Sequence, residues 1–275
     1  MAPTVEKVID ENLELGEAPH WDVETQTLYF VDINGHSIHK YVPATKKHTQ
    51  AHIGSNVSFI IPVEGRNDQL VISIGREVAL ISWDGESDKV SIVKTLYEVD
   101  KGTGHVFNDG KCDPSGRLWA GTIGAPPVSL ESIPHGKGTL YSFSNGKVTS
   151  HVSGLGISNG IAVNIELKTF YYIDSRKGTV DEYDFDIVEG TISNGRPIFT
   201  LEKHDLGGVG DGMAIDVDGN LWVTSVAFGG PNLDELYVTT GRIPIENVTF
   251  TPHDGATYRV TGINTKGLPG VRVKL

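Results

Sequence analysis

One strand pattern recurs along the whole chain and limits its possible folds more than any other feature. Each copy opens with a leucine or phenylalanine followed by aromatic, β-branched or small residues, and the copies start at Leu28, Leu70, Leu118, Phe170, Leu221 and Leu236. The first four intervals are 42, 48, 52 and 51 residues, and the last is 15. Intervals of about 40 to 50 residues are typical of propeller blades.

A second strand pattern follows most copies after about ten residues. Its instances start at His36, Glu77, Gly138, Gly178 and Ala256, and they alternate β-branched or aromatic residues with polar ones. Such segments are expected to pair antiparallel with the leading strands. The sequence therefore predicts an all-β fold, a six-bladed β-propeller that occupies residues 1–275 as a single domain.

The interval between Leu221 and Leu236 is too short for a whole blade. No second strand fits before the last unit begins at Ser225, and roughly 30 residues, about two strands, are missing relative to the other intervals. We therefore predict a fifth blade without two of its strands and an apparent internal deletion near residues 223–226. Such a blade exposes strand edges and apolar faces, so we expect lower stability or association between molecules.

Charge and composition exclude several kinds of partner. The formal net charge is −12, which argues against nucleic acid and anionic membranes. The single cysteine, Cys112, excludes an internal disulfide and is typical of a reducing compartment. The first residues contain no apolar signal-peptide core, so we expect a cytoplasmic protein. The tripeptide Val273–Leu275 differs by one residue from a peroxisomal address, which makes the peroxisome the less favoured location.

Oxygen-bearing residues recur 10 to 12 positions before most of the leading strands. They are Glu17, Ser58, Asn108, Asn159, Asp211 and Ser225. In a propeller the innermost strands begin at one mouth of the central channel, so residues at a shared phase converge there. Two carboxylates and two amides, without histidine or thiolate, suit Ca²⁺, Mg²⁺ or Mn²⁺ better than a structural zinc. The pattern predicts a site for one divalent cation, with water or substrate at the open positions.

A simpler interpretation of each motif is a turn. Asn and Asp tolerate the left-handed backbone region and glycine adopts it freely, so Asn108-Asp-Gly, Ser158-Asn-Gly and Asp211-Gly are also typical turn sequences. The phase that these motifs share across the repeats favours the site.

Several longer motifs connect the chain to a known family. They are Gly16-Glu-Ala-Pro-His-Trp, Asn108-Asp-Gly-Lys-Cys-Asp-Pro-Ser-Gly-Arg-Leu-Trp, Ile157-Ser-Asn-Gly and Asp211-Gly-Met-Ala-Ile-Asp. Through these motifs the chain resembles the senescence-marker protein, regucalcin and gluconolactonase family over nearly its whole length. Within the family it most resembles the luciferin-regenerating enzymes of fireflies, through segments such as Val57–Pro62 and Thr224–Tyr237.

This resemblance implies both a site and an activity. It implies metal ligands at Glu17, Asn159 and Asp211, a substrate contact at Asn108, and a catalytic proton acceptor at Asp211. The implied activity is divalent-metal-dependent hydrolysis of a lactone, with Ca²⁺ favoured and Mg²⁺, Mn²⁺ or Zn²⁺ as alternatives. The likeness to luciferin-regenerating enzymes implies a different small-molecule substrate, oxyluciferin or a similar heterocycle.

Three departures from the family pattern leave another interpretation open. Val106 stands where the family has a substrate-binding arginine, Gly121–Pro126 lacks the family's acidic substrate contact, and the strands that follow Leu221-Trp-Val are missing. A calcium-binding regulatory protein, or a catalytically silent truncated variant, is therefore the alternative to an enzyme.

Overall fold

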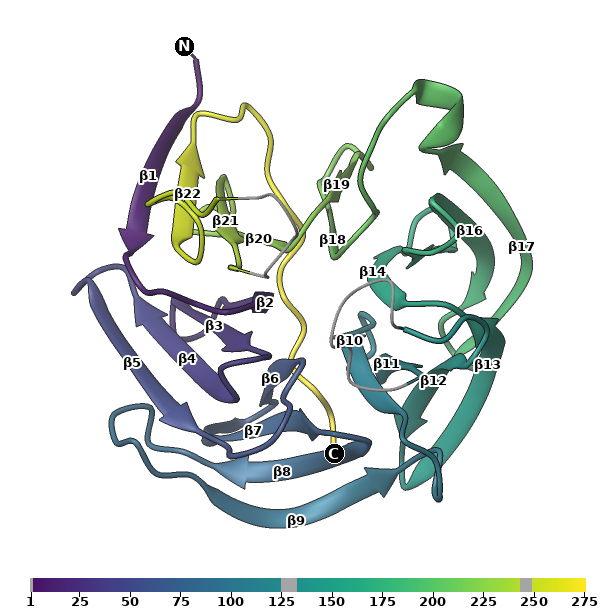
Figure 1. Ribbon diagram of the computed structural model, residues 1–275, viewed down its shortest axis with the longest axis horizontal. Helices are drawn as coiled ribbons and strands as arrows, with labels where there is room; N and C mark the ends of the chain where they lie inside the picture. The colour runs from purple at the N-terminus through teal and green to yellow at the C-terminus, as the bar shows by residue number, and fades with distance from the viewer. Residues whose placement is uncertain (1, 125–132, 243–248) are drawn as a thin grey trace.

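The chain folds as a ring of small antiparallel sheets. The computed structural model describes residues 2–124, 133–242 and 249–275, and within them every regular element is a strand except the 3₁₀ turn η2 (Glu202–His204). Five four-stranded sheets and one two-stranded sheet surround a central axis (Figure 1). None of the described residues forms a helix long and apolar enough to cross a membrane.

The sheets follow one another along the chain, and the strands of each sheet are ordered from the central axis outward. The first contains β2 (Gly16–Asp22), β3 (Thr27–Asp32), β4 (Ser37–Val42) and β5 (Lys47–His52). The second contains β6 (Ile60–Val63), β7 (Arg66–Ile74), β8 (Glu77–Ser82) and β9 (Ser91–Glu98). The third contains β10 (Val106–Cys112), β11 (Leu118–Ile123), β12 (Gly138–Ser144) and β13 (Lys147–Leu155). The fourth contains β14 (Ser158–Asn164), β15 (Thr169–Asp174), β16 (Thr179–Asp186) and β17 (Thr191–Thr200). The two-stranded sheet contains β18 (Met213–Ile215) and β19 (Leu221–Val223), and the last sheet contains β20 (Val226–Gly229), β21 (Glu235–Thr239), β22 (Thr257–Thr261) and β1 (Thr4–Ile9).

The predicted all-β propeller is confirmed, but the number of complete blades is corrected. The six copies of the leading pattern form the second strand of the six sheets, β3, β7, β11, β15, β19 and β21. The described residues form five complete blades, not six, because β18 and β19 have three residues each and no outer partners. The position expected for the fifth blade therefore holds only a two-stranded sheet.

The ring closes through strands from both ends of the chain. β1 pairs antiparallel with β22, from Thr4 opposite Thr261 to Ile9 opposite Thr257. The last blade therefore combines an N-terminal strand with three C-terminal ones. This pairing holds the first and last blades together and fixes the inner strands around one axis.

The hydrophobic core lies between neighbouring blades. Phe59, Phe107 and Phe143 pack between the second and third blades, and Trp119 packs with Phe170 between the third and fourth. These aromatic side chains are almost completely buried. Each blade therefore buries apolar side chains against its two neighbours, which stabilises the ring.

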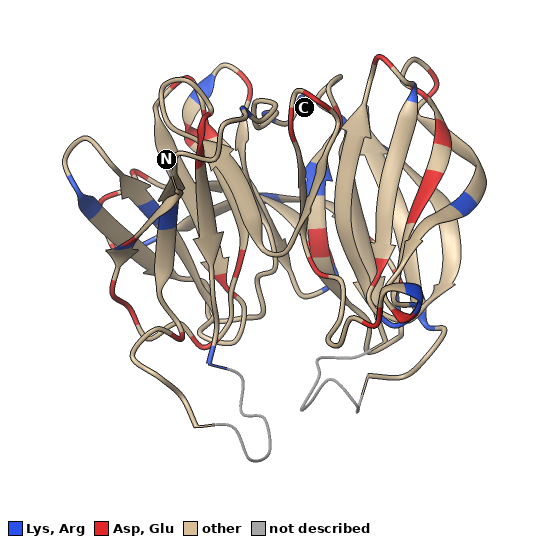
Figure 2. Cartoon of the chain, turned by 90° about the horizontal axis from the view of Figure 1, so that it is seen from above, with Lys and Arg blue, Asp and Glu red and all other residues tan. Residues whose placement is uncertain are grey.

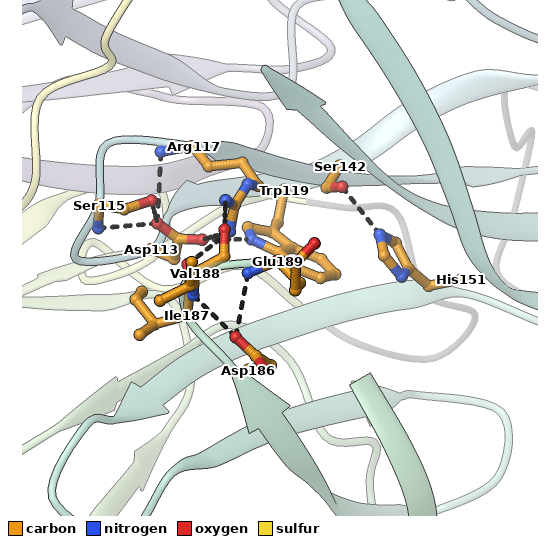
Figure 3. A network of polar contacts seen from close by, with 10 residues as sticks. All are labelled: Asp113, Ser115, Arg117, Trp119, Ser142, His151, Asp186, Ile187, Val188 and Glu189. Atoms are coloured by element: carbon orange, nitrogen blue, oxygen red, sulfur yellow. Dashed lines mark hydrogen bonds and ion pairs between the residues drawn. The ribbon is translucent and has the colours of Figure 1, made fainter. Parts of the chain in front are cut away.

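An aspartate at the end of an inner strand organises the turn into the next strand. Asp113 accepts hydrogen bonds from the Ser115 amide at 2.8 Å and from the Trp119 Nε1 at 2.9 Å, and it pairs with Arg117 at 2.9 Å (Figure 3). Arg117 also donates to the Ile187 and Val188 carbonyls of the fourth blade, in the turn between β16 and β17. The completely buried Asp113 therefore joins a turn, a core tryptophan and the adjacent blade.

The same device supports the two-stranded sheet. Asp216 accepts from the amides of Asp218 at 3.0 Å and Asn220 at 2.8 Å, and from the Trp222 Nε1 at 3.1 Å. The recurring sequence Asp-x-x-Gly-x-Leu-Trp thus forms equivalent turns in a complete blade and in the shortened one. This turn helps to hold β18 and β19 together although they have no outer partners.

The segment after β22 crosses the centre of the ring (Figure 1) and closes one end of the channel. Its main chain pairs with the far ends of the inner strands, through the Leu268 amide to the Ile215 carbonyl of β18 at 3.3 Å and the Val273 amide to the Pro62 carbonyl of β6 at 2.9 Å. The buried Arg272 donates two hydrogen bonds to Asp22, at 2.8 and 2.7 Å. The residues at the beginnings of the inner strands are therefore left to form the opposite mouth of the channel.

The missing strands leave an apolar groove beside the shortened sheet. A cavity of about 520 Å³ is lined by residues that include Ile198, Leu206, Val209 and Val223. These four side chains are between 41% and 53% exposed, which is high for aliphatic residues. The expected liability of the shortened blade has this structural basis, although its effect on stability or association stays a prediction.

Replacing Arg272 with Met is expected to lower the free energy of unfolding by about 3 kcal/mol, because the buried Asp22 carboxylate loses its cationic partner and keeps only the hydrogen bonds from Thr25 among the described residues. Burial alone raises the pKa of Asp22, and the hydrogen bonds from Arg272 lower it to a value below normal. Urea denaturation measures the change. Arg66→Met is the control, since exposed Arg66 bonds only to nearby Gln69 within the described structure. Equal effects of the two substitutions would contradict this role of Arg272.

Candidate metal and substrate site

The predicted site residues lie at the start of the inner strands, where the strands are irregular. The pairing register shifts between Glu17 and His20 in β2, between Phe107 and Asp109 in β10, and between Asn159 and Ile161 in β14. Bulges of this kind redirect side chains that regular alternation would place on a sheet face. Here they lie at the channel mouth opposite the crossing C-terminal segment.

Hydrogen bonds connect the predicted residues from three neighbouring sheets. The Asn159 side-chain amide donates to Asp211 Oδ1 at 2.8 Å and to Ser175 Oγ at 3.1 Å. The Asn108 side-chain amide donates to the Ser158 carbonyl at 2.9 Å. The structure therefore brings Asn108, Asn159 and Asp211 into one connected group.

The alternative interpretation of these motifs as turns is wrong for two of them. Gly110 lies inside β10 and Gly160 inside β14, and neither has a positive φ. At Gly160 an added Cβ would lie 2.6 Å from the Asp211 carbonyl oxygen. The glycine after Asn159 therefore permits the close approach of the segment that carries Asp211.

Glu17 joins this group through electrostatics and a shared cavity. Burial raises the pKa of Glu17 well above its usual range, the negative charge of Asp211 raises it further, and Asp109 adds to the effect. Glu17 and Asp211 both line a cavity of about 350 Å³. Two carboxylates therefore face the same cavity, and their negative charges repel each other.

Two members of the polar series take other roles. Ser58 Oγ lies 2.9 Å from Ser73 Oγ, and Ser225 Oγ lies 2.7 Å from Thr239 Oγ1. Each serine thus joins its inner strand to the next strand of the same sheet. Ser225 also hydrogen-bonds to Glu17, which favours the charged form of that carboxylate.

Asp109 and Lys111 are site residues that the sequence argument missed. Burial and the nearby Asp211 raise the pKa of Asp109, and Lys111 opposes this shift. Lys111 donates a hydrogen bond from Nζ to the Met213 carbonyl across the channel. The available signal was alternation along β10, which places Asp109 and Lys111, two residues apart, on the same side.

The residues fit a divalent cation by their chemistry. Glu17, Asp211 and Asn159 offer only oxygen ligands, and a bound cation would stabilise the charged form of Glu17, which burial and the negative charge of Asp211 disfavour. The Asn159 Oδ1 accepts from the Gly160 amide at 3.1 Å, so a half-turn of the side-chain amide is needed to direct this oxygen at a cation shared with Asp211. Among the described residues, no three His, Cys, Asp or Glu side chains are placed to bind one metal ion. The proposed set differs from such a group, since it has two carboxylates and one amide.

The position where the family pattern has an arginine is apolar and buried. Val106 is buried in a cluster with Ile123, Ile133 and Ile157. Phe250, which is 40% exposed, lines the cavity that contains Glu17 and Asp211. The segment Gly121–Pro126 lacks the family's acidic contact, and its last two positions, 125 and 126, lie outside the described residues.

The model of the SMP-30/Gluconolactonase/LRE-like region matches residues 15–225. The chain belongs to this family. Regucalcin of Pongo abelii is 33% identical and regucalcin of Xenopus laevis 30%, and each alignment covers 96% of this chain and 96% of the relative. The alignment with the Pongo abelii protein has 296 positions although the chain has only 275 residues, which agrees with the loss of strands from this member of the family.

Two solved structures support the fold. A luciferin-regenerating enzyme superposes with a TM-score of 0.92 at 42% identity and covers 100% of both chains. A calcium-binding regucalcin from Agrobacterium tumefaciens has a TM-score of 0.85 at 22% identity and covers 99% of this chain and 98% of its own. The second likeness concerns the fold alone.

Replacing Glu17 with Gln is expected to stabilise the metal-free protein by roughly 1 kcal/mol at pH 8, because it removes a buried negative charge and its repulsion from Asp211. The pKa of Glu17 is higher in the folded than in the unfolded state, so its contribution is present at low pH and is lost as the pH rises through the folded pKa. Chemical denaturation of both proteins in chelator from pH 5 to 8 measures the effect. Glu64→Gln, an exposed control, is expected to change little. A Glu17→Gln protein that is less stable at pH 8 would contradict this account.

Proposed function

We propose that the protein is a divalent-metal-dependent hydrolase that opens a lactone or a similar small ring. The observation that carries the proposal is the convergence of Glu17, Asn159 and Asp211 at the mouth of a closed propeller. The cavity of about 350 Å³ provides space for a small molecule. The family supports a hydrolase, since a gluconolactonase from Xanthomonas campestris shares the fold with a TM-score of 0.69 at 15% identity, covering 94% of this chain and 89% of its own.

Glu17, Asn159 and Asp211 would hold the cation, and Ca²⁺ suits their oxygen atoms. A bound divalent cation supplies positive charge that polarises the carbonyl of the substrate. Asn108 lies beside this group and can orient the substrate through its side-chain amide. The fixed positions of these residues on closed β-strands keep the site organised before substrate arrives.

Asp211 acts as the general base in this proposal. Water attacks the carbonyl carbon of the lactone, and the Asp211 carboxylate takes the proton that the water loses. The ring C–O bond then breaks, and the same proton passes to the leaving ring oxygen to give a hydroxy acid. The hydrogen bond from Asn159 holds Asp211 in position for this transfer.

Asp211→Asn is expected to lower kcat for an aldonolactone by about 100-fold or more, the usual effect of losing a general base. The assay measures hydrolysis of glucono-δ-lactone with Ca²⁺, Mn²⁺, Mg²⁺ or Zn²⁺ added in turn. Asp205→Asn, on an exposed turn, is the control and should retain activity. Full metal-dependent turnover by Asp211→Asn would refute the assignment, and a wild type that binds the metal without turnover would favour the calcium-binding alternative.

A flat aromatic substrate is the second candidate. It is favoured by Phe250 in the cavity and by the apolar cluster around Val106. The 42% identical structural relative is a luciferin-regenerating enzyme, so oxyluciferin is a specific compound to test. In this case apolar side chains replace the polar contacts that a polyol needs.

Phe250→Ala is expected to reduce kcat/KM for the aromatic lactone dihydrocoumarin by roughly tenfold, because about 1.4 kcal/mol of apolar contact is lost. Turnover of glucono-δ-lactone should change much less. Phe199→Ala, which lines the distant groove beside the shortened sheet, is the control. Equal losses for both lactones would exclude Phe250 as an aromatic contact, and incubation with oxyluciferin and metal tests the specific compound.

A further inference from the structure

We propose that Lys111 is the counter-ion of the site and sets the charge of the cation that the site accepts. The inference rests on the proposed function, because it assumes that Glu17 and Asp211 bind a cation. It assigns a role to a residue outside the predicted ligand set.

Lys111 lies deeper in the channel than the predicted ligands. Its side chain leaves β10, and Nζ donates to the carbonyl of Met213 in β18. A cavity of about 30 Å³ is lined by Lys111 together with Glu17 and Asp109. Lys111 is therefore on the floor of the site, where it can act on all the charges without occupying the position of a ligand.

Burial raises the free energy of the charged ammonium group, so Lys111 stays charged only with a compensating interaction. Burial lowers the pKa of Lys111, and the negative charge of Asp109 opposes the change. Asp109 in turn interacts with Asp211, and Glu17 interacts with both aspartates. Lys111 is the one cation among the described groups that act on Asp109. Its charge therefore offsets Asp109 directly, and through Asp109 it reduces the negative charge that faces Glu17 and Asp211.

The charges give the site a definite preference. With a cation bound the three carboxylates would be ionised, and together with one ammonium they would carry a net charge of −2, which a divalent cation neutralises. Asp254, which lines the adjoining cavity, is offset by Arg242. Loss of the Lys111 charge leaves −3, which a trivalent cation neutralises instead. Opposite charges attract more strongly in a partly buried site than in water, so one unit of charge is enough to change the preference.

A purely structural role for Lys111 predicts a different result. If the lysine only anchored the Asp211–Met213 segment, its loss would lower the affinity for every cation that uses the same oxygen ligands. Ca²⁺ and Tb³⁺ both bind oxygen ligands and are similar in size, so their affinities would fall together. The ratio of the two affinities therefore separates a charge effect from a loss of anchoring.

The experiment is calorimetric titration of the folded full-length protein with Ca²⁺ and with Tb³⁺ at pH 8. Lys111→Gln removes the charge but keeps a hydrogen-bond donor, Lys111→Met removes both, and Lys111→Arg keeps both. Lys94→Met, on the exposed face of β9, removes one positive charge far from the channel. We expect the Tb³⁺ to Ca²⁺ affinity ratio to rise about tenfold or more in the Gln and Met variants, and to stay unchanged in the Arg and Lys94 variants.

An unchanged ratio in a folded Lys111→Gln protein overturns the inference. A wild-type protein that binds neither ion would instead contradict the proposed function, so the two failures are distinguishable. If both neutral variants are unfolded without ions, we expect Tb³⁺ to restore their circular dichroism at lower concentrations than Ca²⁺. Equal restoration by the two ions would also overturn the inference.

Discussion

Closure of the ring is the constraint on which the rest of the structure depends. The inner strands converge on one axis only because β1 pairs with β22 and joins the last blade to the first. Residues far apart in the sequence, such as Glu17 and Asp211, then face the same cavity. No single blade contains the site, so its geometry and the stability of the ring are inseparable.

Within this ring, the burial of carboxylates that also repel one another is the main cost of the site. Glu17, Asp109 and Asp211 raise the free energy of the metal-free protein, as the raised pKa values of Glu17 and Asp109 show. Elsewhere the acidic residues are spread over the molecule and are interspersed with a smaller number of Lys and Arg (Figure 2). The crossing C-terminal segment, tied to β2 by Arg272 and Asp22, closes the other end of the channel. The strain is thus confined to the end where a ligand can relieve it.

The sequence predicted the fold from local information that survives in every blade. The strand pattern is local and recurs in all six sheets. The Asp-x-x-Gly-x-Leu-Trp turn is also local, and it recurs where the chain forms β11 and β19. The 15-residue interval also located the missing strands. It could not show that β18 and β19 would stay paired with three residues each, because that depends on packing against Ile173 and Phe228 from neighbouring blades.

The site was predictable only in part for the same reason. A shared phase along the repeat identified Glu17, Asn159 and Asp211, since it reflects where inner strands begin. The phase also included Ser58 and Ser225, whose hydroxyl groups pair within their own sheets. Lys111 and Phe250 lie outside the phase, because Lys111 reaches the site across the channel and Phe250 reaches it from a connection after β21.

The most direct test of the central claim is anomalous diffraction from crystals of the protein grown with Mn²⁺. We expect one strong peak at the open mouth of the channel, within bonding distance of oxygen atoms of Glu17, Asn159 and Asp211. A half-turn of the Asn159 amide relative to the metal-free protein should accompany it. A well-ordered channel mouth without a peak at saturating Mn²⁺, or a peak bound only by other residues, would contradict the account.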